Sequence, residues 1–286
     1  MLKRNSPVQV LIFLPAAWLL FFFVVPLALM AMYSLRPDVR GGLFNFGWSP
    51  TLDHYRTILE SQDYLRLLGV SVQVALVVAL VGTVLAYPIA YFLAFRAQRR
   101  ATVFLTLLIL PFWTSYLLRI IAWKIILGSN GLINSLLLHT GLTQEPISVL
   151  LYSREAVIVT LVYVWLPFVA LPIYAALQRI DRSLLEAAAI NGAPPWLAFL
   201  RVTLPLSLPG VIASFLMVFI PTVGEYVTPL LVGGSRGSLY GNIIEIFFGD
   251  GLNWPLGSAM ALIMLTGVLA LVVVVARLID LRRFLQ

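Results

Sequence analysis

Six long apolar stretches constrain the fold of this chain more than any other feature of its sequence. A bilayer core about 30 Å thick is crossed by roughly 20 apolar residues in a helix. The only charged residues inside the six stretches are Arg119 and Glu225. We therefore predict an all-α membrane protein in which residues 1–286 form one transmembrane domain. The expected spans are Val10–Tyr33, Leu67–Phe95, Ala101–Trp123, Ala156–Leu177, Ser207–Val232 and Gly257–Ala276.

The composition supports the membrane class and excludes several kinds of active site. Hydrophobic residues make up 61% of the chain and charged residues 11%, against about 45–50% and about 25% in soluble domains. The absence of cysteine excludes disulfides, thiolate nucleophiles and cysteine-ligated metals. His54 and His139 lie far apart in polar stretches, where we expect exposed loop residues. The first stretch is too long for the apolar core of a signal peptide, about 7–15 residues, so we expect it to stay as the first helix.

The distribution of basic residues predicts the orientation of the helices. With the N-terminus inside, the inner segments are 1–9, 96–100, 178–206 and 277–286. They carry eleven Lys and Arg against three Asp and Glu, a balance of +8, whereas the rest of the chain balances at −1. Basic residues favour the cytoplasmic side of a membrane. We therefore expect both termini in the cytoplasm, and the basic balance requires no nucleic acid as a partner.

The inner segment between the fourth and fifth stretches has the pattern of two short helices joined by a turn. Ser183 and Glu186 have the spacing of a helix N-cap and the third residue of its helix. Gly192 suits the left-handed turn that ends such a helix. Pro194 or Pro195 suits the first turn of the next one. A helix–turn–helix on the cytoplasmic surface is the expected result.

The second of these short helices has an apolar face with two possible uses. Trp196, Phe199 and Leu200 have the i, i+3, i+4 spacing of one helix face. Pro205 and Pro209 are expected to close the element before the fifth span. The residues alone leave open whether this face lies in the lipid headgroups or docks a cytoplasmic protein.

A family resemblance distinguishes these two uses. The segment resembles the EAA loop of the integral membrane subunits of bacterial ABC importers, with valine in place of the usual isoleucine as the only departure. In that family the loop is the coupling helix that docks on the ATPase subunit, and the resemblance implies the type I importer permease fold. The matching residues are Glu186, Ala187, Ala188, Gly192, Val202, Leu204 and Pro205.

Three further segments resemble the permeases of spermidine/putrescine importers: residues 110–123, 220–234 and 253–259. The resemblance implies a multi-pass permease subunit in a bacterial inner membrane, carrying putrescine, spermidine or a similar small organic cation. Related permeases carry opines, amino-acid derivatives or other small organic ions, so these remain the alternative substrates.

The resemblance also implies the partners of the chain. No G-x-x-x-x-G-K-[ST] phosphate-binding motif occurs in the sequence. We therefore expect no cofactor on this chain and no enzymatic activity of its own, with ATP and Mg²⁺ held by a dimer of ATPase subunits. The other implied partners are a second permease or a copy of this chain, a periplasmic or lipid-anchored substrate-binding protein, and membrane lipid.

Polar and aromatic residues inside the spans are candidates for the substrate path. A carboxylate at membrane depth is costly unless it faces a cavity or a partner, so Glu225 could meet a cationic substrate. Trp113, Tyr116 and Tyr226 could add cation–π contacts. Arg119 would repel a polycation, which favours either an Arg119–Glu225 pair or an amphoteric substrate. A position of Glu225 near the outer interface is a third interpretation.

Two other classes of protein are compatible with six spans. An ion-coupled secondary transporter would need an acidic cluster or an inverted repeat, and the sequence shows neither. A receptor or assembly factor would have no use for a loop that docks an ATPase. We therefore predict the importer permease.

Overall fold

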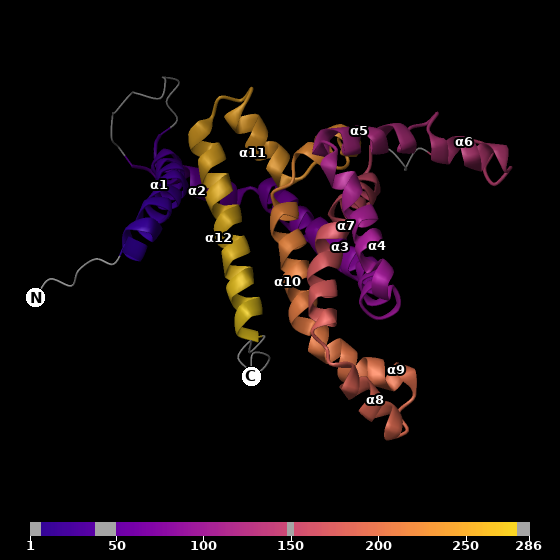
Figure 1. The fold of residues 1–286 in the computed structure, drawn as a ribbon. Coiled ribbons are helices and arrows are strands. Elements are labelled where there is room, and N and C mark those ends of the chain that lie inside the picture. The colour runs from indigo at the N-terminus through magenta and orange to yellow at the C-terminus, as the bar shows by residue number, and fades with distance from the viewer. Residues whose placement is uncertain (1–6, 38–49, 148–151, 279–286) are drawn as a thin grey trace, which may run out of the picture. The chain divides into compact units, whose positions relative to one another are not determined.

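The computed structural model describes residues 7–37, 50–147 and 152–278, and all regular structure in these ranges is helical (Figure 1). Short π or 3₁₀ turns (η) interrupt or extend several of the α-helices. The longer helices are α1 (Pro7–Ser34), α3 (Gln62–Tyr91), α7 (Arg154–Gln178), α10 (Leu204–Val223) and α12 (Trp254–Leu278). The shorter ones are α2 (Asp53–Glu60), α4 (Ala101–Ile109), α5 (Tyr116–Leu127), α6 (Leu132–His139), α8 (Arg182–Ile190), α9 (Pro195–Ala198) and α11 (Tyr240–Phe248).

Within the described residues, six helical segments are long and apolar enough to cross a membrane, which confirms the predicted class. Many large apolar side chains on them are exposed, as lipid-facing surfaces require. In the first segment none of the most apolar window is buried. The six segments are Ile12–Ser34, Gln62–Arg96, Tyr116–His139, Arg154–Gln178, Pro195–Val223 and Trp254–Arg277.

The contacts divide the chain into two compact units, and the expectation of one domain stays a prediction. The first unit comprises residues 1–65 and 243–267, and the second comprises residues 66–242 and 268–286. In the first unit, His54 Nε2–H donates a hydrogen bond to the Arg36 carbonyl oxygen, 2.7 Å away. His54 is therefore a half-buried helix residue and not the exposed loop residue that we expected.

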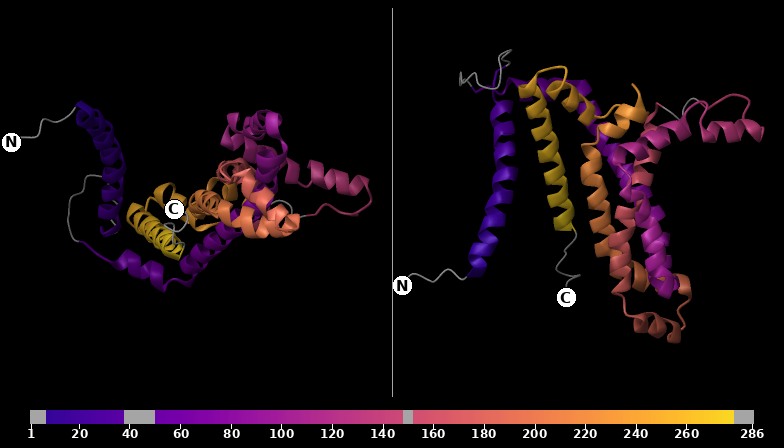
Figure 2. Two further views of the ribbon diagram at one scale, coloured as in Figure 1. Left: turned by 60° about the horizontal axis from the view of Figure 1, so that its bottom comes forward. Right: turned by 45° about the horizontal axis from the view of Figure 1, so that its top comes forward.

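The pair of helices α7 and α10 forms the centre of the second unit, and the views in Figures 1 and 2 agree on this. Gly210 allows their close approach, since a Cβ at this position would lie 2.5 Å from Ala176 Cβ and 2.7 Å from the Pro172 carbonyl oxygen. Small residues at such crossings are typical of membrane helices. Figure 1 shows α8 and α9 beyond one end of this pair, whereas α6 projects at the opposite end.

Helix α3 contributes a face of small buried residues to the same unit. The face repeats at helical spacing, and Gly82 on it meets Val169 of α7, since a Cβ added at Gly82 would lie 3.6 Å from Val169 Cγ2. The opposite face carries exposed Leu80, Val84 and Leu85. The small buried residues are Ser71, Ala75, Ala79, Gly82, Ala86 and Ala90.

The third predicted span, residues 101–123, is not one continuous helix, and the third apolar segment long enough to cross a membrane is Tyr116–His139 instead. A 3₁₀ turn η3 (Leu110–Trp113) follows α4, and Thr114 and Ser115 are extended before α5 begins. Pro111 explains the break, because its ring disfavours a regular α-helix. The segment runs antiparallel to α7: Phe112 packs on Phe168, with ring centroids 4.4 Å apart, and Trp123 packs on Tyr163, with centroids 5.3 Å apart.

The fifth predicted span is displaced toward the N-terminus. The helix that contains it starts at Pro195 and ends at Val223, whereas we predicted residues 207–232. Pro205 and Pro209 lie within it, so they do not close the preceding element as expected. A π turn, η5 (Phe199–Thr203), widens the helix directly before Pro205. This turn leaves room for a residue that lacks an N–H group.

Candidate functional site

The first part of the candidate site is the N-terminus of α8, which Asp181 caps. Its Oδ1 accepts a hydrogen bond from the Ser183 backbone N–H at 2.9 Å. This contact, with a smaller contribution from the Ser183 side chain, holds the pKa of Asp181 below its usual range. The cap is therefore present at neutral pH and is lost only as the pH falls through that lowered value. Our assignment of Ser183 as the cap is wrong, because α8 begins at Arg182.

Gly192 ends α8 in the predicted left-handed turn. Its φ is +77°. The Gly192 N–H donates to the Ala189 carbonyl oxygen at 2.9 Å, and the Ala193 N–H donates to the Ala188 carbonyl oxygen at 3.0 Å. Both bonds together define a Schellman motif, which satisfies carbonyl groups at the helix end. Asn191 adds a third bond, from its side-chain amide to the Ala187 carbonyl oxygen at 2.8 Å.

We expect Gly192→Val to disrupt this turn and Gly192→Asn to preserve it. A Cβ here meets nothing within 4 Å, so the cost of a side chain comes from the backbone conformation alone. That cost is about 1–2 kcal/mol for an ordinary residue, whereas asparagine adopts this conformation routinely. Transport by an assembled complex should fall about 5- to 30-fold for the valine variant. Equal transport by both variants would show that the turn has no role in function.

The second helix continues without interruption into the fifth span. Pro195 is its first residue, as one of the two predicted possibilities requires, and Pro194 precedes it as the N-cap residue. The helix passes through α9 and η5 into α10. The hairpin of α8 and α9 is therefore joined by continuous helical backbone to a membrane-spanning helix.

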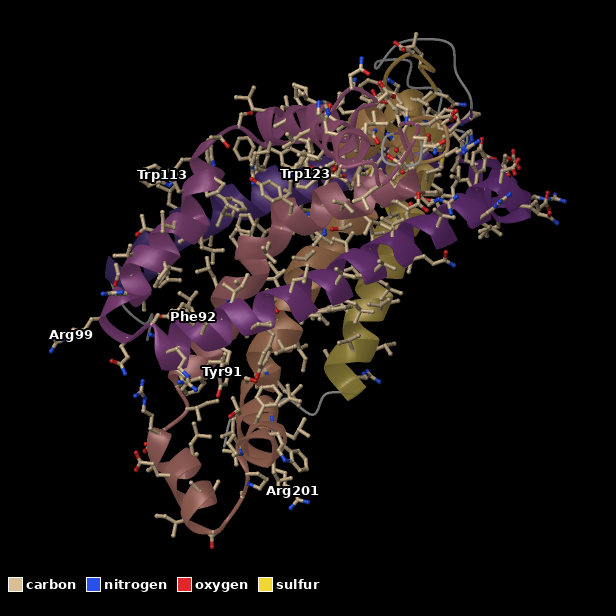
Figure 3. All side chains as sticks on the ribbon, turned by 90° about the vertical axis from the view of Figure 1, so that its right-hand side faces the viewer. Tyr91, Phe92, Arg99, Trp113, Trp123 and Arg201 are labelled. Carbon is tan, nitrogen blue, oxygen red and sulfur yellow. The ribbon has the colours of Figure 1, made fainter. Side chains whose placement is uncertain are left out.

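The surface of the hairpin carries exposed apolar side chains. Ile190 is 86% exposed at the turn, and Leu184, Trp196 and Leu200 are also exposed. Phe199 differs from the prediction of a shared face, because its ring packs on the rings of Tyr87 and Tyr91 of α3. In Figure 3, Arg99 and Arg201 point away from the helices at this end of the second unit.

The residues of the EAA pattern lie on both arms of this hairpin. Glu186 and Ala187 are exposed on α8, and Ala188 is half-buried. The Glu186 carboxylate makes no ion pair or hydrogen bond with the described residues. Val202, Leu204 and Pro205 are half-buried around η5 and the start of α10. The pattern thus combines a free carboxylate on the surface with the packed base of the second arm.

Glu225 lies just beyond the end of α10 and caps the next helical turn. Its Oε1 accepts a hydrogen bond from the Thr228 backbone N–H at 3.0 Å. The π turn η6 (Pro229–Gly233) follows directly. Gly241 of α11 approaches closely, since a Cβ there would lie 2.8 Å from the carbonyl oxygens of Gly224 and Glu225. Glu225 is half-buried at a helix break, and not inside a continuous span as we expected.

The break after α10 is connected to the break before α5. The Tyr116 hydroxyl hydrogen-bonds to Thr228 Oγ1 at 2.9 Å. Glu225 accepts from the N–H of the same Thr228, and the Arg119 guanidinium lies 5.9 Å from the centroid of the Tyr116 ring, so the structure brings three of the path candidates together. No ion pair joins Arg119 to Glu225 among the described side chains. Instead, the Arg119 guanidinium lies over the Phe112 ring, 4.4 Å from its centroid.

The two other path candidates are surface residues of this chain. Trp113 is 82% exposed and points outward in Figure 3. Tyr226 is exposed as well, and its carbonyl oxygen accepts a bond from the Asn242 side chain at 2.8 Å. No group of three or more acidic or histidine side chains in the described ranges is arranged to hold a metal ion.

Several residues of these sites were missed by sequence reasoning. Asp181 and Asn191 cap the ends of α8, and Tyr87 and Ser207 join α3 to α10. Asp181 and Asn191 had a local signal, because both residue types favour helix ends. The other contact had no such signal, because its two residues belong to different helices.

The comparison with known families identifies the class of this protein. The family described as "binding-protein-dependent transport system inner membrane component" matches residues 82–284. The chain belongs to this family. It is therefore a multi-pass inner membrane component of a transport system, and the class predicted from the hairpin pattern is confirmed.

Two relatives from this family are similar to the chain over nearly its whole length. The spermidine/putrescine transport system permease protein PotB of Salmonella typhimurium is 36% identical and covers 96% of this chain, with 94% of its own length matched. The protein of the same name from Escherichia coli is 37% identical, with 90% of this chain and 92% of its own length covered.

Solved structures show the same fold at low sequence identity. A chain of a bacterial ABC transporter that imports the acidic polysaccharide alginate has a TM-score of 0.75 and 17% identity, with 96% of both chains covered. A second structure of the alginate transporter, in complex with its periplasmic protein, has a TM-score of 0.73 and 18% identity. It covers 95% of this chain and 93% of that chain. The fold is thus that of an ABC importer permease.

Proposed function

We propose that this chain is the permease subunit of an importer for small organic cations of the polyamine class, such as spermidine and putrescine. The observation that carries this proposal is the identity of 36–37% with two spermidine/putrescine permeases, over 90–96% of the chain. The half-buried carboxylate of Glu225 provides a negative charge that suits an ammonium group.

The α8–α9 hairpin is proposed to dock an ATPase subunit in the cytoplasm. Its exposed Ile190 and Trp196 offer an apolar surface, and exposed Glu186 offers a carboxylate to a basic residue of the ATPase. Large side chains that become buried when two proteins bind contribute most of the binding energy of the interface. The continuous helix from α9 into α10 would carry a movement of the ATPase into the membrane domain.

The remaining partners follow from this role. We propose that a second permease, or a copy of this chain, completes the substrate path and that a periplasmic or lipid-anchored binding protein delivers the substrate. Two ATPase subunits bind ATP and Mg²⁺, and this chain binds no cofactor. The alginate transporter in complex with its periplasmic protein supports the arrangement by analogy.

Reconstitution tests the proposal directly. The chain is co-expressed with its ATPase, second permease and binding protein, and the purified complex is placed in liposomes. We expect ATP-dependent uptake of radiolabelled spermidine or putrescine. Uptake of neither cation by a complex that hydrolyses ATP in response to its binding protein would exclude the polyamine class.

An amphoteric substrate is the second candidate, and Arg119 is the observation that favours it. Its Nε atom is buried and has no hydrogen-bond partner among the described residues. A guanidinium at this position could bind a carboxylate group of the substrate, as in an opine or amino-acid derivative. Competition of such compounds with spermidine for the binding protein distinguishes the two candidates.

The proposed orientation predicts which introduced cysteines react from outside. Because the chain contains no cysteine, each single variant has one thiol. Gln98, Thr140, Ser183 and Ser235 are all exposed, so access depends on the side of the membrane. In intact cells, an impermeant reagent should label cysteine at 140 or 235 and leave 98 and 183 unlabelled. Labelling at 183 from outside would reverse the orientation.

A further inference from the structure

Helix α3 is hydrogen-bonded to the start of α10 close to the α8–α9 hairpin, the coupling hairpin of the proposed function. The Tyr87 hydroxyl and Ser207 Oγ are 2.8 Å apart, and the Ser207 side chain is fully buried. The Ser207 hydroxyl donates its proton to the Leu204 carbonyl oxygen at 3.0 Å. Since serine has only one such proton, Tyr87 must be the donor in the bond between the helices.

The ring of Phe199 packs at the same junction. It meets Tyr87 edge to face, with centroids 5.6 Å apart and an interplanar angle of 90°. It also meets Tyr91, one turn further along α3, with centroids 6.0 Å apart. Edge-to-face pairs of this kind are a favourable aromatic geometry. Phe199 directly follows α9, so the ring connects the second arm of the hairpin with α3.

Both helices depart from regular α-helical hydrogen bonding beside this junction. In η5, the Leu204 N–H donates to the Phe199 carbonyl oxygen, the i to i−5 pattern of a π turn. On α3, the π turn η1 (Phe92–Arg96) starts directly after Tyr91. Figure 3 shows Tyr91 near this end of the second unit. Single π turns occur frequently at functional sites.

We propose that Tyr87, Phe199 and Ser207 form a positioning contact that transmits the movement of the coupling hairpin to α3. This inference rests on the proposed docking of an ATPase at α8–α9. When the ATPase displaces α9, the Phe199 ring pushes on α3, and the Tyr87–Ser207 bond keeps α3 and α10 together. The adjacent π turns absorb the change of helix direction. The three residues contact neither ATP nor substrate, and they act by coupling two helices.

The test uses the complete importer in liposomes and measures ATP hydrolysis with and without the loaded binding protein. In Tyr87→Phe and Ser207→Ala, we expect stimulation by the binding protein to fall about fivefold, the typical worth of one hydrogen bond in an equilibrium. The double variant should be no worse than Ser207→Ala alone, because both substitutions remove the bond between the two helices. Phe199→Ala should have an effect at least as large. The matched control is Tyr163→Phe on α7, which removes a hydroxyl that forms no hydrogen bond to the described residues.

Three outcomes would overturn the proposal. Stimulation could be unchanged in all three single variants, or the effects of Tyr87→Phe and Ser207→Ala could add. The amount of assembled complex could also fall in parallel with stimulation, which would mark the contact as merely structural. Failure of the proposed docking gives a different result, because the ATPase would then not bind the permease even in the wild-type complex. A coupled wild type with unaffected variants would refute only the role of this contact.

Discussion

Replacing Ile190 with aspartate should lower the affinity of the ATPase for the permease by about thirtyfold or more. Ile190 is 86% exposed at the turn of the hairpin, so the change removes no contact that stabilises the permease itself. In the docked complex the same position would be buried. A residue of this kind at the centre of an interface contributes about 2 kcal/mol or more, and the new carboxylate would also lose its hydration.

The measurement is the amount of ATPase that co-purifies with the permease from membranes, together with uptake. Leu142→Asp is the matched control, because Leu142 is 73% exposed in the segment that follows α6, at the opposite end of the second unit. That variant should retain the full amount of ATPase. If Ile190→Asp also retains it, the hairpin is not the docking surface.

The number of spans could be predicted from the sequence because apolar length is a property of each segment alone. The breaks inside the spans could not be predicted equally well. Residues 101–123 are predominantly apolar, so their mean hydropathy does not reveal that Thr114 and Ser115 interrupt the helix. Pro111 was a local signal for this break. Membrane helices tolerate proline where neighbouring helices satisfy the freed backbone groups, so Pro111 alone does not identify a break.

The hairpin shows the same division between local and tertiary information. The left-handed turn at Gly192 was predicted correctly, because glycine adopts positive φ at little cost. The N-cap was placed wrongly, because Asp181 and Ser183 are both good caps and the choice depends on where α7 ends. Phe199 was assigned to the docking face, and its actual neighbours on α3 are more than a hundred residues earlier in the sequence.

The second large effect is expected for Glu225→Gln, which should reduce uptake of spermidine at low concentration by about 10- to 100-fold. The hydrogen bond of a charged group contributes about 1.5–3 kcal/mol, and glutamine forms only the weaker neutral version. Glutamine still offers a side-chain oxygen to the Thr228 N–H, so the cap at the helix break persists. The charge is therefore the only property that the variant removes.

The amount of assembled complex distinguishes a role of Glu225 in the substrate path from a role in an ion pair with Arg119. If Glu225 meets the cation, the single variant assembles normally and the loss lies in uptake at low substrate. If Glu225 instead balances Arg119, the single variant leaves an uncompensated guanidinium beside the Tyr116 ring, and the amount of complex falls. The double variant with Arg119→Gln should then restore assembly.

The charge of Glu225 must also be distinguished from acidic charge elsewhere on the chain. Glu245→Gln is the control, because this carboxylate is exposed on α11 and its loss removes the same charge. Uptake by that variant should match the wild type, since an exposed carboxylate remains solvated and screened by salt. If uptake by Glu225→Gln is normal as well, Glu225 neither contacts the substrate nor pairs with Arg119. Glu225 would then act only as the cap of the turn at Thr228, a role for which its charge is not required.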